Sequence, residues 1–286
     1  MLPDEIQSFC SERFGKVQSF QYCSGGCINN GGKITTYSGE FFVKWNSSTQ
    51  FPDMFSKEKQ GLQLLSKSTS LTIPKVVEVY EGTQYSCLVL EYLNSAPKKL
   101  DYWVQLGRGL ALLHAENASH FGLDHDNYMG SLKQKNSAHS NWIEFFIHQR
   151  IDPQIKLALA NNKIGKNDKK AIEALYPKLP DLFPAEKPSL THGDLWSGNI
   201  MPGSNGEPAL IDPAVSFAHR ETDIAMTQLF GSLPNEFYAG YNEINPLTAG
   251  WKDRLELYNL YPLLVHVNLF GGGYLSQVMQ IVKRYH

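Results

Sequence analysis

Apolar and polar residues alternate in short runs over the first third of the chain. Such alternation is typical of half-buried strands. It predicts two strands within residues 20–37, around the glycine-rich segment SGGCINNGG, and further strands at 39–45, 76–80 and 86–90. In the same region, apolar residues recur at helical spacing at 4–14 and 53–66. We therefore expect a small sheet with helical segments beside it.

Helical spacing dominates the rest of the chain. It predicts helices at 100–115, 141–161, 167–176, 223–230, 234–241, 254–268 and 275–285. Asn141 is placed to cap the second of these helices. The segment FGLDHDNYMGSLKQKN at 121–136 is polar and irregular. The change of pattern near Leu93 predicts two lobes, a strand-rich lobe over 1–93 and a mainly helical lobe over 94–286.

Composition narrows the possible partners and the compartment. The 286 residues are 42% hydrophobic, enough for a sizeable core, and the net charge of −2 is spread without a basic stripe. We therefore expect no nucleic-acid or membrane partner and a small-molecule substrate. The four cysteines have neither a zinc spacing nor the density of a disulfide framework, and no signal peptide or long apolar run is present. These features predict a cytoplasmic protein with reduced thiols.

The stretch from Ser189 to Asp223 gathers most of the candidate chemistry. Asp194 and Asn199 lie five residues apart, and Asp212 ends the apolar run ALI thirteen residues after Asn199. The turn cluster PGSNG between them predicts a hairpin that brings Asn199 and Asp212 together at its open end. An amide and a carboxylate oxygen are ligands that Mg²⁺ accepts when it shares them with phosphates. Asp194 would stay free to act as a base.

Two charged residues of the first third are candidates for the other side of such a site. Lys44 closes an apolar strand and either reaches solvent or points into a cleft. Glu58 lies next to the apolar stripe of its helix, where a carboxylate needs a partner, and Lys44 is the candidate; the alternative is a solvated surface glutamate. The glycines at 25, 26, 31 and 32 allow close approach to a ligand but are equally typical of a hairpin loop.

The order and spacing of these residues resemble the protein-kinase-like phosphotransferases, whose catalytic loop runs His, Asp, then Asn five residues after the Asp, followed by a metal-binding Asp. Here the positions are His192, Asp194, Asn199 and Asp212. HGDLWSGN is similar to the small-molecule kinases of the aminoglycoside and choline kinase type. The chain most closely resembles the fructosamine kinase (ketosamine-3-kinase) family, through the motifs SGGCINN, FVKWN, MFSKE, THGDLWSGN, LIDPAVSFAHRETDIAMTQLFG and NLFGGGYLSQ.

This resemblance implies an α+β, bilobal protein-kinase-like fold: an N-lobe with an antiparallel sheet plus one helix, and a larger, mainly helical C-lobe. It implies ATP with Mg²⁺ and phosphorylation of the 3-hydroxyl of a ketosamine, the sugar adduct of an amine, a lysine or a protein, in a reaction of the deglycation-repair type. Asp212 is followed by Pro and Ala instead of the Phe-Gly of protein kinases, so we expect no switch driven by a phenylalanine.

The resemblance also implies a role for each site residue. Asp194 would accept or orient the proton of the substrate hydroxyl. Lys44, held by Glu58, would neutralise the α and β phosphates, and Asn199 and Asp212 would bind Mg²⁺.

The remaining nucleotide contacts would come from the backbone. The Glu91 carbonyl would accept a hydrogen bond from the adenine amino group, and the Leu93 amide would donate one. Gly25, Gly26 and Cys27 would form the loop over the phosphates. Cys27 is either a small loop residue or an oxidisable thiol able to block nucleotide binding.

Three further residues lie around the implied catalytic loop. His192 and Asp223 would support it by hydrogen bonds. Trp196 either stacks on the sugar or its amine-bearing arm, or is a packing residue of the C-lobe. The sequence leaves open the preferred ketosamine and the oligomeric state. Two other functions compete, a kinase of the same fold acting on an aminoglycoside or a choline-like alcohol, and a nucleotide-binding pseudokinase.

Overall fold

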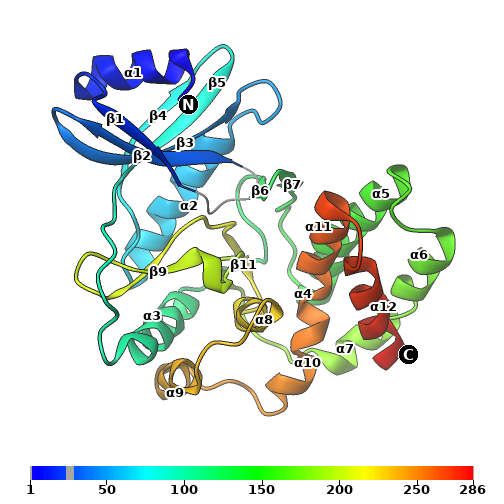
Figure 1. Cartoon of the computed structure of the whole chain (residues 1–286). Helices are drawn as coiled ribbons and strands as arrows, with labels where there is room; N and C mark the ends of the chain where they lie inside the picture. The colour runs from blue at the N-terminus through cyan, green and yellow to red at the C-terminus, as the bar shows by residue number, and fades with distance from the viewer. Residues whose placement is uncertain (1, 24–28, 286) are drawn as a thin grey trace.

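The computed structural model describes residues 2–23 and 29–285, and over these residues the N-terminal third forms a five-stranded antiparallel sheet in the order β1-β2-β3-β5-β4 (Figure 1). Its strands span Ser19–Tyr22 (β1), Asn30–Thr36 (β2), Gly39–Ser47 (β3), Val76–Glu81 (β4) and Tyr85–Glu91 (β5). The strands predicted from alternation are all present. Residues 30–32 of the SGGCINNGG segment begin β2, and its residues 24–28 are outside the described ranges.

A helix covers each face of this sheet (Figure 1). Because side chains alternate along a strand, Val43 and Trp45 of β3 pack in a cluster with α1 (Asp4–Phe14), and Lys44 between them faces the other way. Leu88 and Leu90 of β5 pack in the cluster that includes α2 (Met54–Ser68). Helical spacing predicted both helices, at 4–14 and 53–66; α1 stands beside the one helix that the resemblance implied, because the sheet buries both faces.

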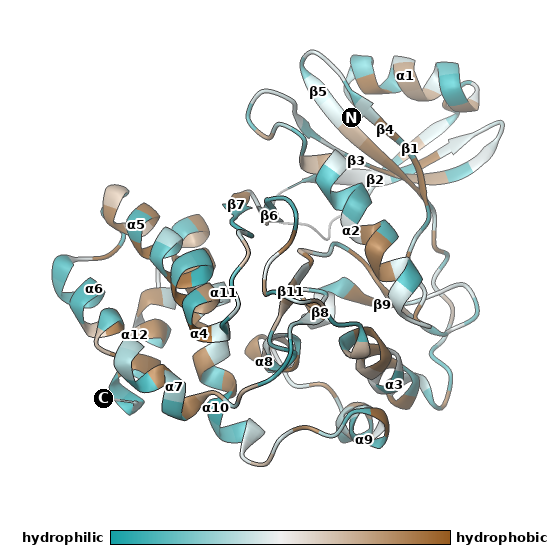
Figure 2. Ribbon diagram, turned by 180° about the vertical axis from the view of Figure 1, so that it is seen from behind, coloured by the Kyte–Doolittle hydropathy of each residue, from teal (hydrophilic) through white to brown (hydrophobic). Residues whose placement is uncertain are grey.

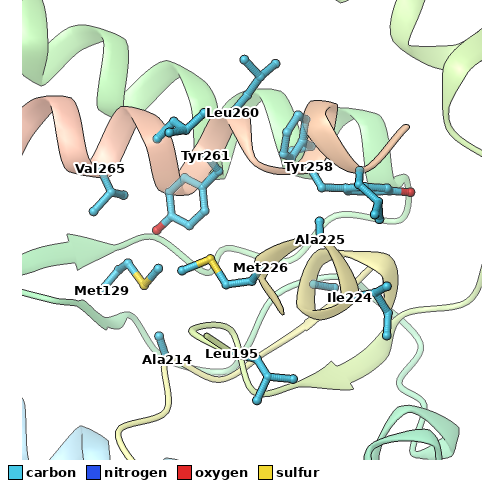
Figure 3. Close-up of a cluster of buried hydrophobic side chains, with 14 of the residues drawn as sticks. Met129, Leu195, Ala214, Ile224, Ala225, Met226, Tyr258, Leu260, Tyr261 and Val265 are labelled. Carbon is cyan, nitrogen blue, oxygen red and sulfur yellow. The ribbon is translucent and has the colours of Figure 1, made fainter. Parts of the chain in front are cut away.

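The C-terminal two thirds are mainly helical and enclose the larger core. The helices span Tyr102–Ala115 (α3), Trp142–Phe145 (α4), Asp152–Ala160 (α5), Lys166–Glu173 (α6), Leu179–Leu182 (α7), Glu221–Leu229 (α8), Asn235–Ile244 (α9), Trp251–Tyr258 (α10), Leu260–Phe270 (α11) and Tyr274–Arg284 (α12). Figure 2 shows that α3 is mainly hydrophobic, whereas α6 at the periphery is mainly hydrophilic. Side chains from α8, α10 and α11 meet in the core beneath the cleft (Figure 3).

Three short two-stranded ribbons lie within the described part of the C-lobe. The predicted hairpin between Asn199 and Asp212 is present as β9 (Ile200–Pro202) and β10 (Pro208–Leu210). A second ribbon pairs β8 (Ser189–Thr191) with β11 (Ser216–Ala218). The third pairs β6 (Asn127–Met129) with β7 (Leu132–Gln134), so the expectation that 121–136 is irregular was wrong. Strands of three residues are too short to produce a recognisable alternation.

Two helix predictions also need correction. The helix predicted at 254–268 is divided into α10 and α11 at Asn259, whose side chain donates to the Ala225 carbonyl at 3.0 Å. The helix predicted at 141–161 starts as expected, with Asn141 Oδ1 accepting from Ile143 N–H at 2.7 Å. It then widens to a π-helical turn at Phe146–Ile151 before α5. No helix in the described ranges has both the length and the apolarity to cross a bilayer.

Candidate active site

A cavity of about 730 Å³ lies between the two lobes. Its upper wall comes from β2, β3, α2 and the end of β5, and its lower wall from the β6–β7 ribbon, the loop after β8 and the β9–β10 hairpin. Lys44, Glu58, Asp194, Asn199 and Asp212 all line it. The structure thus brings together candidate residues from the first third of the chain and from the stretch between Ser189 and Asp223.

Lys44 is held between two carboxylates. Its Nζ lies 2.7 Å from Glu58 Oε1 and 2.9 Å from Asp212 Oδ1. Burial by itself lowers the pKa of Lys44, but the carboxylates of Asp212 and Glu58 outweigh it and raise that pKa. Burial, with Asp212 nearby, raises the pKa of Glu58 against the opposing effect of the ammonium. The predicted pairing of Lys44 with Glu58 is confirmed, and the alternative of a solvated glutamate is excluded.

Asp194 lies in the loop 192–199, which follows β8. Asn199 Nδ2 donates to both the Asp194 carbonyl at 2.8 Å and its Oδ2 at 3.0 Å, so the amide fixes the carboxylate from five residues away. Burial raises the pKa of Asp194 to about 7, with Asp212 and Asp223 contributing in the same direction and Asn199 opposing. A carboxyl group with a pKa near neutrality is suited to exchange a proton during a reaction.

Asp223, at the start of α8, holds the loop by its backbone. Its carboxylate accepts from His192 N–H at 2.7 Å and from Gly193 N–H at 2.9 Å. His192 contributes its side chain: Nε2 donates to the Ile211 carbonyl at 3.0 Å, and Nδ1 accepts from Asp194 N–H at 3.3 Å. Burial lowers the pKa of His192, so the imidazole is neutral. The side chains of His192 and Asp223 therefore both bind the backbone of the loop, as their predicted supporting role requires.

The β9–β10 hairpin places Asn199 beside Asp212. Ile211 N–H donates to the Asn199 carbonyl at 3.1 Å, and Asp212 adopts a left-handed backbone with φ 55°. Because Asn199 uses its Nδ2 on Asp194, its Oδ1 is the atom left for a ligand. An amide oxygen and a carboxylate lining one cavity fit a magnesium ion that also binds phosphate oxygens.

The residues that were expected to contact the adenine of the nucleotide also line the cavity. Glu91 and Leu93 are both in the wall, together with Leu90. The Glu91 carboxylate accepts from Lys75 N–H at 2.9 Å, so its side chain is bound to the chain that enters β4. Gly25, Gly26 and Cys27 lie outside the described residues, while Cys23 and Gly31 on either side of that segment line the cavity.

Trp196 is a packing residue of the C-lobe, as one of its two interpretations predicted, and its stacking on a sugar stays a prediction. It lines the cavity and packs against the C-lobe core, with its ring 5.9 Å from that of Phe230 in an edge contact. His266 lies 4.9 Å from Phe230 and 4.9 Å from Tyr274 between ring centroids. We call this part of the cavity the aromatic wall, formed by Trp196, Phe230, His266, Phe270 and Tyr274.

Sequence reasoning missed several residues that position the site. His114 of α3 places Nε2 3.1 Å from Asp223 and Nδ1 2.8 Å from the Tyr241 hydroxyl, and it was not among the predicted site residues. A histidine on the buried face of a predicted helix is a signal that could have identified it. Asn127 and Gln134 had no such signal, because the strands of the β6–β7 ribbon are too short to show an alternation.

Sequence comparison identifies relatives along nearly the whole chain. The family model for fructosamine kinase matches residues 3–286. A probable ketoamine kinase of Synechocystis sp. is 38% identical, covering 94% of this chain and 90% of its own length. The ketosamine-3-kinase of Mus musculus is 34% identical, covering 93% of this chain and 94% of its own. The chloroplastic protein-ribulosamine 3-kinase of Arabidopsis thaliana is 36% identical over 91% of this chain and 80% of its own.

Solved structures agree with this grouping. A Thermobifida fusca protein assigned as a fructosamine-3-kinase superposes with a TM-score of 0.88 at 30% identity, covering 99% of both chains. An aminoglycoside phosphotransferase crystallised with AMP-PNP and hygromycin B superposes with a TM-score of 0.69 at 18% identity, covering 98% of both chains, and shows the shared fold. The fold is thus the expected bilobal, protein-kinase-like one, and the chain belongs to the fructosamine kinase family.

Proposed function

We propose that this protein transfers the γ-phosphoryl group of ATP to the 3-hydroxyl of ketosamines. The observation that carries the proposal is a single cavity lined by the Lys44 ammonium between two carboxylates, by Asp194 with a pKa near neutrality, and by the aromatic wall. Membership of the fructosamine kinase family and relatives named ketosamine-3-kinase and protein-ribulosamine 3-kinase support the same reaction.

On the nucleotide side, Lys44 neutralises the α and β phosphates while Glu58 keeps its ammonium directed into the cleft. The Glu91 carbonyl and Leu93 amide bind the adenine edge at the end of the cavity. The proposal includes a nucleotide-binding lobe of residues 1–93 and a C-lobe of residues 94–286, with the adenine at their junction. Gly25, Gly26 and Cys27 belong to the proposed loop over the phosphates.

On the acceptor side, Asp194 takes or orients the proton of the attacking hydroxyl, and Asn199 holds its carboxylate in place. When bound to Asn199 and Asp212, Mg²⁺ supplies charge neutralisation at the phosphate oxygens. His192 and Asp223 bind the backbone of loop 192–199 and so hold Asp194 in position in the cavity. The transfer itself requires mostly alignment and electrostatic stabilisation, because its transition state is loose.

The aromatic wall favours a ketosamine as the acceptor. The carboxylates among the described lining residues are Glu58, Glu91, Asp194 and Asp212, none of which belongs to that wall. Aromatic rings bind sugar faces and single cations, such as the amine of a ketosamine, whereas polycationic aminoglycosides need carboxylates. We assign Trp196 to stack on the sugar or its amine-bearing arm.

The rim of the aromatic wall is open to solvent, with Phe270 50% and Phe230 38% exposed. A sugar on a lysine side chain can therefore enter while the rest of the molecule stays outside. On this basis we include glycated proteins among the substrates and propose a deglycation-repair role in the cytoplasm, where the buried, unpaired thiols of Cys10 and Cys87 remain reduced.

The decisive experiment is incubation with Mg-ATP and a panel of ribulosyl-lysine, fructosyl-lysine, an aminoglycoside and choline, followed by ³¹P and ¹H NMR of the products. We expect a phosphate on O3 of the ketosamines only. Asp194→Asn and Asp212→Ala should each lower turnover by at least about 100-fold, whereas Asp181→Asn, at an exposed position, should leave it unchanged.

Phosphorylation of the aminoglycoside or choline in place of the ketosamines would overturn the acceptor assignment. Nucleotide binding without transfer to any acceptor would instead identify a pseudokinase.

A further inference from the structure

The β6–β7 ribbon lies in the cleft between the two lobes, where its residues Asn127, Tyr128 and Met129 line the cavity. A two-stranded ribbon of this size has little stability of its own, so its position depends on what it contacts. Gln134, at its far end, is 2% exposed and is absent from the residues that line the cavity. The ribbon contacts both halves of the proposed site.

Towards the C-lobe, two buried amides hold the chain that follows Asp212. Asn127 Nδ2 donates to the Val215 carbonyl at 2.9 Å, and Gln134 Nε2 donates to the Ala214 carbonyl at 3.0 Å. On its other side Ala214 N–H donates to the His192 carbonyl at 2.9 Å. The segment between loop 192–199 and the ribbon is thus fixed from two directions, and it carries the left-handed Asp212 at its start.

The amides are themselves fully engaged. Gln134 Nε2 also donates to Asn127 Oδ1 at 2.9 Å, and Gln134 Oε1 accepts from the Tyr261 hydroxyl at 2.9 Å. Arg150 from the π-helical turn donates to Asn136 Oδ1 at 2.9 Å, and Asn136 donates to Asn127 Oδ1 at 3.0 Å. Figure 3 shows Tyr261 reaching from α11 towards the region where Met129 and Ala214 lie. Buried networks of this kind rigidify what they contact.

Towards the N-lobe, the ribbon contacts the entrance of α2. The Tyr128 hydroxyl donates to the Pro52 carbonyl at 2.9 Å, and the ring of Phe51 meets that of Tyr128 edge-on at 6.5 Å between centroids. Two residues after Pro52 the chain enters α2, the helix that carries Glu58. One ribbon therefore touches the segments that deliver Glu58 and Asp212, the two carboxylates that bind Lys44.

We propose that the β6–β7 ribbon is a fixed brace that assembles the Lys44, Glu58 and Asp212 cluster, with Gln134 and Tyr128 as positioning residues. In protein kinases the corresponding lysine–glutamate pair and metal-binding aspartate are brought into place by activation-loop phosphorylation and movement of a helix. Here permanent hydrogen bonds from the ribbon do this work. The inference rests on the proposed use of Mg-ATP and is independent of which acceptor receives the phosphate.

The test compares Gln134→Met and Tyr128→Phe with Tyr37→Phe, a control at a 75% exposed tyrosine on the β2–β3 turn. Gln134→Met keeps the volume but removes the hydrogen bonds to Ala214, Asn127 and Tyr261. Tyr128→Phe removes only the hydroxyl that reaches Pro52. The measurements are the affinity for Mg-AMP-PNP by calorimetry, kcat and KM for both substrates, and the melting temperature.

We expect Gln134→Met to weaken Mg-AMP-PNP binding about tenfold, the effect of roughly one lost positioning hydrogen bond, and to shift the Mg²⁺ dependence of turnover to higher concentrations. Tyr128→Phe should weaken nucleotide binding threefold to tenfold. The KM for the ketosamine should stay within twofold of wild type in both variants. Because nucleotide binding is measured without an acceptor, it tests the brace even if the wild type fails to phosphorylate ketosamines.

A merely structural role predicts a different result. It predicts a lower melting temperature with unchanged nucleotide affinity and Mg²⁺ dependence in the folded protein, and that outcome in Tyr128→Phe would overturn the proposal. If Gln134→Met does not fold, the Tyr128→Phe result decides alone.

Discussion

At the scale of single residues, the carboxylate of Asp194 within loop 192–199 and that of Asp223, which binds this loop, have opposite pKa shifts. Burial acts on both, but Asp223 accepts backbone hydrogen bonds from His192 and Gly193 and a side-chain one from His114, and its pKa is lowered. Asp194 is bonded through its carboxylate to the Asn199 amide, and its pKa rises to about 7. Hydrogen-bond donors and the neighbouring histidines thus keep Asp223 charged as a support, whereas burial beside Asp212 and Asp223 lets Asp194 exchange a proton.

The raised pKa of Asp194 gives a prediction for stability. A carboxyl group that binds its proton more tightly in the folded state stabilises the fold at low pH, and that contribution is lost as the pH rises from about 4 to about 7. Asp194→Asn removes the burial of a charge, so it should raise the free energy of unfolding at pH 8 by about 2–4 kcal/mol. At pH 4 the difference should vanish.

Chemical unfolding at both pH values checks this, with Asp181→Asn as the exposed control. An Asp194→Asn variant that is no more stable than wild type at pH 8 would contradict the environment described for this carboxyl group.

Much of the site could be predicted at this scale, because it depends on residue types at fixed spacings. Lys44, Glu58, Asp194, Asn199 and Asp212 could be identified in this way, and the structure places all of them in one cavity. Asn127 and Gln134 could not, since their importance comes from partners more than 70 residues away in the chain. A sequence pattern records which side chain is present, and long-range partners are set only when the chain folds.

At the scale of elements, the packing of α3 against α9 positions His114, which binds Asp223. His114 lies on α3 and its partner Tyr241 on α9. The helices approach closely at glycines: a Cβ on Gly107 would lie 2.1 Å from the Phe237 carbonyl oxygen, and one on Gly240 would lie 2.5 Å from the Val104 carbonyl oxygen. This contact leaves no space for an added methyl group.

Gly107→Ala should therefore destabilise the protein by roughly 3 kcal/mol, because the overpacked helices have to separate. The separation should also loosen His114 and lower turnover in the protein that remains folded. The measurement is thermal unfolding with parallel activity, and Gly273→Ala, where an added Cβ meets no atom within 4 Å, is the control. Equal melting temperatures for the two variants would refute the close contact.

Element types were predictable where periodicity extends over several turns or a full strand, as in α3 and β3. They were not predictable where tertiary contacts override the local pattern. The break between α10 and α11 at Asn259 depends on the Ala225 carbonyl, and the β6–β7 ribbon depends on amides from Asn127 and Gln134. In both places a polar side chain finds a backbone partner that is distant in sequence.

At the scale of the molecule, Lys44 connects the lobes, since its ammonium binds Glu58 above the cleft and Asp212 below it. Lys44→Met should leave these two carboxylates to repel each other and should remove the cation proposed for the phosphates. Mg-ATP at 100 times its dissociation constant stabilises a protein by about 2.7 kcal/mol. We expect the variant to lose most of this stabilisation at the same nucleotide concentration.

Thermal unfolding with and without Mg-ATP measures the effect. Lys33→Met is a suitable control because Lys33 pairs with Glu40 and is not among the residues that line the cavity. A Lys44→Met protein that gains as much from Mg-ATP as wild type would show that the nucleotide is held elsewhere.

The continuity of the cavity has a consequence for inhibition. The same space is lined by Leu93, by Lys44 and Asp194, and by Tyr274 of the aromatic wall. A single compound that joins adenosine to an aminated ketose through a phosphate-length spacer would occupy the proposed nucleotide and acceptor sites together. Attachment of one half raises the effective concentration of the other, so such a bisubstrate compound would bind far more tightly than either half and would discriminate against kinases whose acceptor side lacks the aromatic rings.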